Sequence, residues 1–242
     1  MLSKSMAGAM TLALALLASS CARILPWKDE PVATEVNLSF TLEQNLIHLQ
    51  TVRINNRTGR YILGSAAPRT ILDDGFAGTG PHALQISEKE TVRLSPATLD
   101  LGGVADAIIG VEAWRNRAIS IDYRSGLVTY QKEGIHRGLM TIYQYDNEPM
   151  INAIVNGTQL SAIVDTTSPD TLILPARTPG RGTARVTIAG QDFGVIDVQY
   201  ANVREARVGN RLLSRFFVTI DYGKRVVGLW RDPRTPVVAG AL

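Results

Sequence analysis

The sequence predicts an all-β protein made of two similar β-barrel lobes in tandem. Val, Ile and Thr are spread along the chain, and few segments suggest long helices. Two separate pairs of segments also repeat, one at an offset of 101 residues and the other at 99. Chance seldom produces two matches at nearly the same offset, so the repeat predicts a duplicated fold.

The composition argues against nucleic-acid binding and against a metal site. The 242 residues are 45% hydrophobic and 19% charged, and the formal net charge of +3 comes from scattered basic residues. This pattern predicts no nucleic-acid partner. The histidines His48, His82 and His136 lie far apart and have no cysteine near them. We therefore expect no metal and no cofactor.

Residues 1–20 resemble a signal peptide. Lys4 provides a positive start, and an apolar run from Met6 to Leu17 is short for a membrane span. Small residues then lead to Cys21, the only cysteine. This resembles the lipobox of bacterial lipoproteins, although Leu17 stands one place earlier than is usual there. Ordinary cleavage near Ser20 and a buried N-terminal helix are the alternatives.

The lipobox resemblance implies a cellular location for the mature protein. Cys21 would become the lipid-modified N-terminus and anchor the chain to a membrane. Ala22, as the next residue, resembles outer-membrane rather than inner-membrane sorting signals. We therefore expect export to the periplasmic side of a bacterial membrane, the outer one, with residues 21–35 as a tether.

The first repeat aligns residues 54–72 with residues 155–173 without a gap. Each copy predicts a strand, an Asn-type turn, a second strand, a turn of small residues and a short apolar strand. Asn156-Gly157 is the strongest hairpin signal in the chain, and Asn55-Asn56 holds the same place in the first copy.

The second repeat aligns residues 109–128 with residues 208–227. Alternating apolar residues predict a half-buried strand at 118–122 and another at 217–221, each followed by a turn and a further strand. Trp114 and Leu213 hold equivalent places ahead of them. The lobes should therefore span 36–134 and 135–232, with a loose tail at 233–242.

The motif around Asp165-Thr166-Thr167 resembles the catalytic turn of aspartic proteases. That family places Asp, Thr or Ser, and Gly after an apolar strand, and later in each lobe an apolar-apolar-Gly strand. Ile108-Ile109-Gly110 and Val208-Gly209 fit the later strand, and Trp114 and Leu213 fit the buried apolar anchor that follows it in that family. The resemblance covers nearly the whole mature chain in two copies. It implies a bilobal, pepsin-like fold of two retropepsin-like barrels.

The catalytic residues match this family only in part. Aspartic proteases need two facing carboxylates that share a proton, one acting as acid while the other activates water. The second lobe offers Asp165, but the equivalent place in the first lobe is Gly64. Ser65 and Thr166 remain where the family links its two loops through hydroxyl groups. Asp165 should then be a solitary carboxylate in a partly solvated cleft.

No other carboxylate replaces the missing one in this reading. Asp73 and Asp74 follow a short strand and fit an exposed turn. Asp170 belongs to the same lobe as Asp165, so it cannot face it. Asp122 and Asp221 recur in the terminal strand pairs and fit strand-turn structure.

Three hypotheses about function follow. The first is a catalytically inactive protein whose interlobe cleft binds an extended peptide or partner by strand addition. The second is an active aspartic endopeptidase that uses Asp165 with an unidentified second acid, or pairs two Asp165 loops in a homodimer. The third is an unrelated β-protein with coincidental repeats.

Overall fold

The computed structural model describes residues 35–132, 134 and 140–234. The expected signal peptide, Cys21 and almost all of the tether lie outside these residues, as does most of the expected C-terminal tail. Among the described residues nearly all regular structure is strand, which confirms the all-β prediction. No helix of the described part is long and apolar enough to span a membrane.

The first lobe consists of strands β1 to β11 with two single-turn helices. Its strands are β1 (Val36–Glu43), β2 (Leu46–Leu49), β3 (Arg53–Ile54), β4 (Tyr61–Leu63), β5 (Ile71–Asp73), β6 (His82–Gln85), β7 (Thr91–Leu94), β8 (Ala97–Leu99), β9 (Ala107–Ile109), β10 (Ala118–Asp122) and β11 (Leu127–Gln131). Its helices are α1 (Asp74–Ala77) and the 3₁₀ turn η1 (Val111–Ala113).

The second lobe repeats the order with fewer, longer strands. They are β12 (Thr141–Gln144), β13 (Met150–Val155), β14 (Thr158–Val164), β15 (Leu172–Pro175), β16 (Gly180–Ile188), β17 (Gln191–Ala201), β18 (Ala206–Val208), β19 (Phe217–Asp221) and β20 (Val226–Trp230), with helix α2 (Asn210–Leu213) before β19.

Strand pairing repeats between the lobes as well. β4 pairs in parallel with β9, and β14 pairs in parallel with β18. β5 runs antiparallel to β9, as β15 does to β18. The hairpin turns also match, because Asn55, Asn56, Asn156 and Gly157 all have positive φ, as a type I′ turn requires. The duplication read from the sequence is therefore present in the topology.

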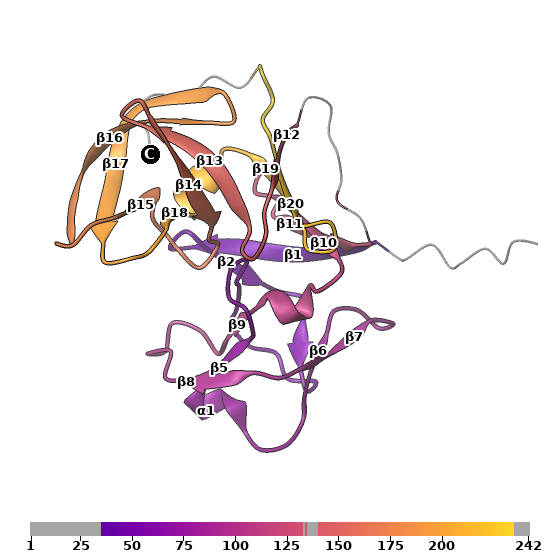
Figure 1. Cartoon of the computed structure of the whole chain (residues 1–242). Coiled ribbons are helices and arrows are strands. Elements are labelled where there is room, and N and C mark those ends of the chain that lie inside the picture. The colour runs from indigo at the N-terminus through magenta and orange to yellow at the C-terminus, as the bar shows by residue number, and fades with distance from the viewer. Residues whose placement is uncertain (1–34, 133, 135–139, 235–242) are drawn as a thin grey trace, which may run out of the picture. The chain divides into compact units, whose positions relative to one another are not determined.

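The two lobes differ in whether their strands close into a barrel. Strands β13, β14, β18, β15, β17 and β16 form a closed barrel in the second lobe, seen at the upper left of Figure 1. It closes because the 9-residue β16 pairs with β17 along one edge and with β13 along the other. The corresponding β6 and β7 have 4 residues each and join β3 in a separate three-stranded sheet.

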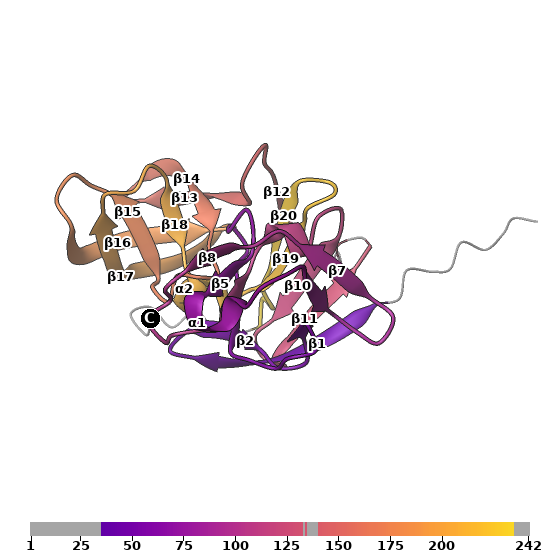
Figure 2. The same ribbon diagram turned by 90° about the horizontal axis from the view of Figure 1, so that it is seen from below.

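A continuous eleven-stranded sheet joins the lobes through the pairing of β10 with β19 (Figures 1 and 2). In this ladder Ser120 lies opposite Thr219, its own equivalent in the repeat, and their hydroxyl oxygens are 3.0 Å apart. Two equivalent residues can face each other in an antiparallel pair only where a local two-fold axis passes between them.

The apolar core runs through both lobes without a break. One cluster of buried side chains includes Tyr61 and Trp114 of the first lobe together with Phe193 and Leu213 of the second. Trp114 and Leu213 are completely buried, as expected of anchors that precede the central strands. This core and the central sheet fix the loops after β4 and β14 against each other.

Candidate functional site

The candidate site is formed by the two loops that leave β4 and β14. The backbone N–H of Gly64 donates to the carbonyl of Ile109 at 2.9 Å, and that of Asp165 donates to Val208 at 3.0 Å. These are equivalent bonds, since both acceptors end the strands that pair in parallel with β4 and β14. The repeat therefore brings Gly64 and Asp165 to equivalent places in the two lobes.

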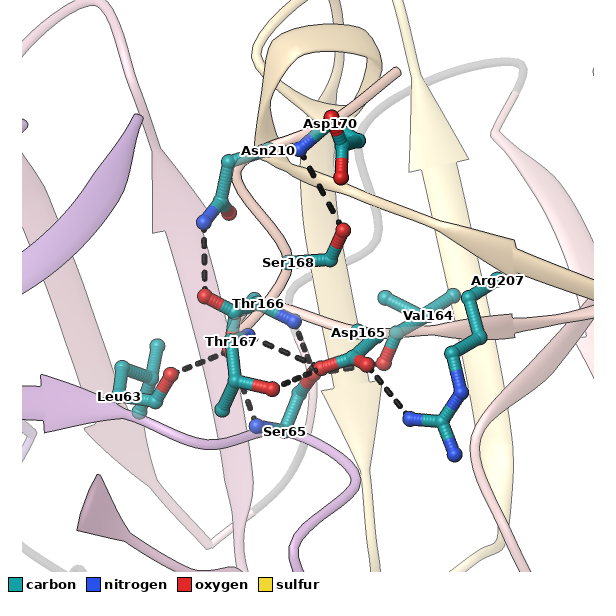
Figure 3. Close-up of polar contacts among 10 residues, drawn as sticks. All are labelled: Leu63, Ser65, Val164, Asp165, Thr166, Thr167, Ser168, Asp170, Arg207 and Asn210. Atoms are coloured by element: carbon teal, nitrogen blue, oxygen red, sulfur yellow. Dashed lines mark hydrogen bonds and ion pairs between the residues drawn. The ribbon is translucent and has the colours of Figure 1, made fainter. Parts of the chain in front are cut away.

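The hydroxyl groups of Ser65 and Thr166 hold the two loops together (Figure 3). The Ser65 hydroxyl donates to the Val164 carbonyl at 2.6 Å and accepts from the Thr166 N–H at 3.0 Å. The Thr166 hydroxyl donates to the Leu63 carbonyl at 2.5 Å and accepts from the Ser65 N–H at 2.9 Å. Both side chains are fully buried. Each lobe thus satisfies backbone groups of the other.

Two equivalent tyrosines support these loops from the opposite lobe. Tyr222 donates to the Ser65 carbonyl at 3.0 Å. Tyr123 donates at 2.8 Å to the side chain of Asn210, whose amide donates to the Thr166 carbonyl at 2.7 Å. Burial raises the pKa of both phenols above the usual value, so they stay protonated donors.

The Asp165 carboxylate has partners on both oxygens (Figure 3). Oδ1 accepts from the backbone N–H of Thr167 at 3.0 Å and from its hydroxyl at 2.5 Å. Oδ2 accepts from Nη1 of Arg207 at 2.6 Å. Asp165 is only 4% exposed. The expectation of a solitary carboxylate in a partly solvated cleft is therefore wrong: β18 supplies a cation, and the loop closes over the other oxygen.

The position opposite Asp165 leaves little room for a side chain. A Cβ on Gly64 would lie 2.8 Å from Cγ2 of Ile108 and 3.1 Å from Cβ of Ala67. Ile108 is the repeat equivalent of Arg207, since both are central residues of the strands β9 and β18. One lobe therefore pairs Asp with Arg, whereas the other pairs Gly with Ile.

Three of the other aspartates considered in the sequence have structural contacts elsewhere. Asp73 caps α1 by accepting from Gly75, and it also accepts from the Leu101 N–H. Asp122 and Asp221 accept backbone N–H groups in the turns after β10 and β19. Among the described residues the polar partners of the Asp165 carboxylate are Thr167 and Arg207, and no group of three His, Cys, Asp or Glu could hold a metal ion.

A cavity of about 480 Å³ lies beside the Ser65 loop and takes its walls from both lobes. Its lining includes Ala66, Pro68 and Arg115 of the first lobe and Tyr145, Glu148 and Tyr222 of the second. The Tyr145 hydroxyl is buried and finds no hydrogen-bond partner among the described residues. An interlobe space with polar and aromatic walls is therefore present next to the joined loops.

Solved structures resemble this chain in fold. The crystal structure of the aspartic proteinase from Irpex lacteus superposes with a TM-score of 0.60 and 12% sequence identity, covering 86% of this chain and 100% of that one. The chain has an aspartic-protease-like fold. No protein-family model matches the sequence, and no curated protein matches it either.

Two residues of the candidate site, Arg207 and Asn210, were not predicted from the sequence. Arg207 is a charged residue in the middle of an otherwise apolar three-residue strand, where the first lobe has Ile108. That exchange in the aligned repeat was a usable signal. Asn210 gave no such signal, because a buried amide at a helix start looks like any polar capping residue.

Proposed function

We propose that the protein is a catalytically inactive member of the aspartic-protease-like fold that binds an extended peptide between its lobes. The observation that carries the proposal is the state of Asp165. Its carboxylate is paired with Arg207 and hydrogen-bonded to Thr167, and no acid stands at Gly64.

The chemistry of this fold explains why that arrangement supports inactivity. Peptide hydrolysis by two carboxylates needs one ionised group to take a proton from water and one protonated group to give a proton to the scissile carbonyl. Arg207 occupies one oxygen of the Asp165 carboxylate, and Thr167 occupies the other. Gly64 has nothing to donate. Neither role is filled in the described residues.

Binding without cleavage is supported by the features that remain. The loops are held rigidly by Ser65 and Thr166, and the cavity beside them has walls from both lobes. A fixed site loses less entropy when a ligand binds than a mobile one does. An active endopeptidase would need a second acid beside Asp165. Among the described residues no second acid is hydrogen-bonded to Asp165.

Peptide binding can be tested with fluorescent pools of random peptides about eight residues long, measured by polarisation. We expect binding to the purified protein, and mass spectrometry should recover the bound pool uncut. Ala66→Phe, which fills part of the interlobe cavity, should weaken binding at least about tenfold. Thr178→Phe, at an exposed position outside that cavity, serves as the control. Absence of binding to any pool would contradict the proposal.

We also propose that the protein is a lipoprotein anchored through Cys21 at the periplasmic side of the outer membrane, as the signal-like start and the Ser20-Cys21 junction indicate. Mass spectrometry of the mature N-terminus should show a diacylglyceryl group on Cys21. Cys21→Ala should release the protein from the membrane fraction, because stable anchoring needs at least two lipid signals and this variant would have no lipid attached at residue 21. An unmodified mature terminus at another residue would refute this.

A further inference from the structure

The first lobe has a strand pairing that the second lobe lacks. In the first lobe β1 pairs with β11 through Val36–Ser39 and with β2 through Phe40–Glu43. The carbonyl of Ser39 also accepts from the Gln50 N–H at 2.9 Å, which extends the ladder between β1 and β2. The central sheet therefore continues without a break into the sheet of the first lobe.

β12 holds the place of β1 in the second lobe, but it has one neighbouring strand where β1 has two. In the first lobe the Phe40 N–H donates to the Gly126 carbonyl at 2.9 Å. The Tyr145 N–H makes the equivalent bond to Arg225 at 3.0 Å. Among the described residues, however, β12 pairs with β20 alone, and β13 pairs with β14 and, at Ala153–Val155, with β16. β12 is therefore an edge strand of the central sheet (Figures 1 and 2).

A cavity of about 490 Å³ lies along this edge. Its lining includes four consecutive residues of the β12 segment, Ile142–Tyr145, and three of β13, Met150–Asn152. Successive side chains of a strand point to opposite faces of the sheet, so a space that touches four in a row follows the edge of the strand. The cavity therefore occupies the place where the first lobe has the ladder between β1 and β2.

The backbone of β12 offers hydrogen-bonding groups to this cavity. In an antiparallel pair, alternate residues direct their N–H and C=O groups toward the partner strand and away from it. Tyr145 bonds toward β20, so the backbone groups of Ile142 and Gln144 point away from β20. Gln144 is the equivalent of Ser39, whose carbonyl accepts from β2 in the first lobe. The edge is therefore set up to pair with one more strand.

The walls of the β12 cavity carry more acidic than basic side chains. Asp146, Glu148 and Glu205 line it together with one arginine, Arg204. Arg204 lies 3.5 Å from Glu205, and its side chain is 95% exposed. Among the described residues Asp146 and Glu148 form no hydrogen bond or ion pair through their carboxylates. A cavity with this balance of charge favours an occupant that carries positive charge.

We propose that β12 binds an extended basic peptide as an added strand in this cavity. The peptide runs antiparallel to β12, as β2 does to β1, and pairs with the outward backbone groups of Ile142 and Gln144. Main-chain hydrogen bonds supply the affinity, while Asp146 and Glu148 favour Lys or Arg side chains. This site goes beyond the proposed function, because the Ser65 loop and Ala66 do not line it.

The probes are two labelled pools of peptides about eight residues long, acetylated and amidated at their ends. One pool has two fixed lysines, the other has glutamine at the same positions, and neither contains any other charged residue. In the unmodified protein we expect the lysine pool to bind about fivefold more tightly by polarisation. Its binding should also slow amide hydrogen exchange at Ile142 and Gln144 at least about tenfold.

Ile142→Pro removes an outward N–H of β12, and proline is tolerated at such positions of an edge strand. It should weaken binding of the lysine pool at least about tenfold, whereas Asn37→Pro, the equivalent change on β1, should leave binding unchanged. Asp146→Asn with Glu148→Gln should abolish the preference for lysine but keep the exchange protection. Glu88→Gln, at an exposed acid of the first lobe, should keep both. Circular dichroism melting verifies that each variant is folded.

Equal binding of the two pools, or exchange at Ile142 and Gln144 that the peptide does not slow, would overturn the inference. Binding that is lost in Ala66→Phe and kept in Ile142→Pro would also overturn it, while supporting the interlobe site. The reverse result would support the β12 site and count against the interlobe one. A dimer seen by sedimentation that Ile142→Pro abolishes would assign the edge to a second copy and overturn the peptide. If Ile142→Pro does not fold, the exchange measurement on the unmodified protein decides.

Discussion

Peptides incubated with the purified protein will be recovered uncut at every pH between about 3 and about 8. Loss of one general acid or base typically lowers a rate by about 10²–10⁴-fold, and loss of a group that works as part of a unit costs more. Here Gly64 replaces one acid, and the other is held by Arg207 at 2.6 Å. Breaking that ion pair would not supply the missing partner.

Restoring activity requires more than restoring the family motif. Gly64→Asp with Ala66→Gly and Thr167→Gly recreates the motif, but the new Cβ would lie 2.8 Å from Cγ2 of Ile108. Adding Ile108→Ala removes that contact, and Arg207→Leu frees the Asp165 carboxylate. We expect weak cleavage only when both are included, measured by mass spectrometry of a peptide pool.

The control for this restoration is the same combination carrying Asp165→Asn, which should be inactive. A different result would reverse the interpretation: pepstatin-sensitive cleavage by the unmodified protein, lost on Asp165→Asn, would show an active endopeptidase with a second acid.

Ser65→Ala and Thr166→Val should each lower the free energy of unfolding by about 1–3 kcal/mol, because each leaves buried backbone groups of the other lobe unpaired. The double variant should lose less than the sum, since the two hydroxyls satisfy one shared network. Denaturant titration monitored by tryptophan fluorescence measures both values.

Thr129→Val is the matched control for these hydroxyl variants. Its hydroxyl donates to Asn37 at 2.8 Å in an exposed pair between β11 and β1, so its removal should change stability by less than about 0.5 kcal/mol. If the Ser65 and Thr166 variants unfold at the same denaturant concentration as the unmodified protein, the joined loops do not stabilise the contact between lobes.

Much of the fold was accessible from the sequence because duplication doubles each signal. The Asn turns, the alternating strands and the anchors Trp114 and Leu213 each appear at two places with one spacing. Local patterns of this kind depend on backbone preference and burial, which single segments carry. The offset also identified Ser65 and Thr166, which the structure places in mutual hydrogen bonds.

The environment of Asp165 was harder to predict because it depends on which side chain of a distant strand points toward it. Arg207 is 42 residues away along the chain and reaches Asp165 only through the parallel pairing of β14 with β18. Closure of the barrel was equally hard to predict, because it depends on pairing between distant strands. It follows from the lengths of β16 and β17 rather than from their composition.

The pairing of β10 with β19 also sets the order in which the molecule can be completed. Their facing residues are 95 to 103 positions apart, so during synthesis β10 remains an uncovered edge of the first lobe until residues 217–221 emerge. An uncovered edge readily accepts any compatible strand, including β10 of another nascent copy. Contacts between such distant segments also form slowly. Formation of this strand pair therefore both protects the chain from mispairing and joins the lobes whose Ser65 and Thr166 loops are hydrogen-bonded to each other.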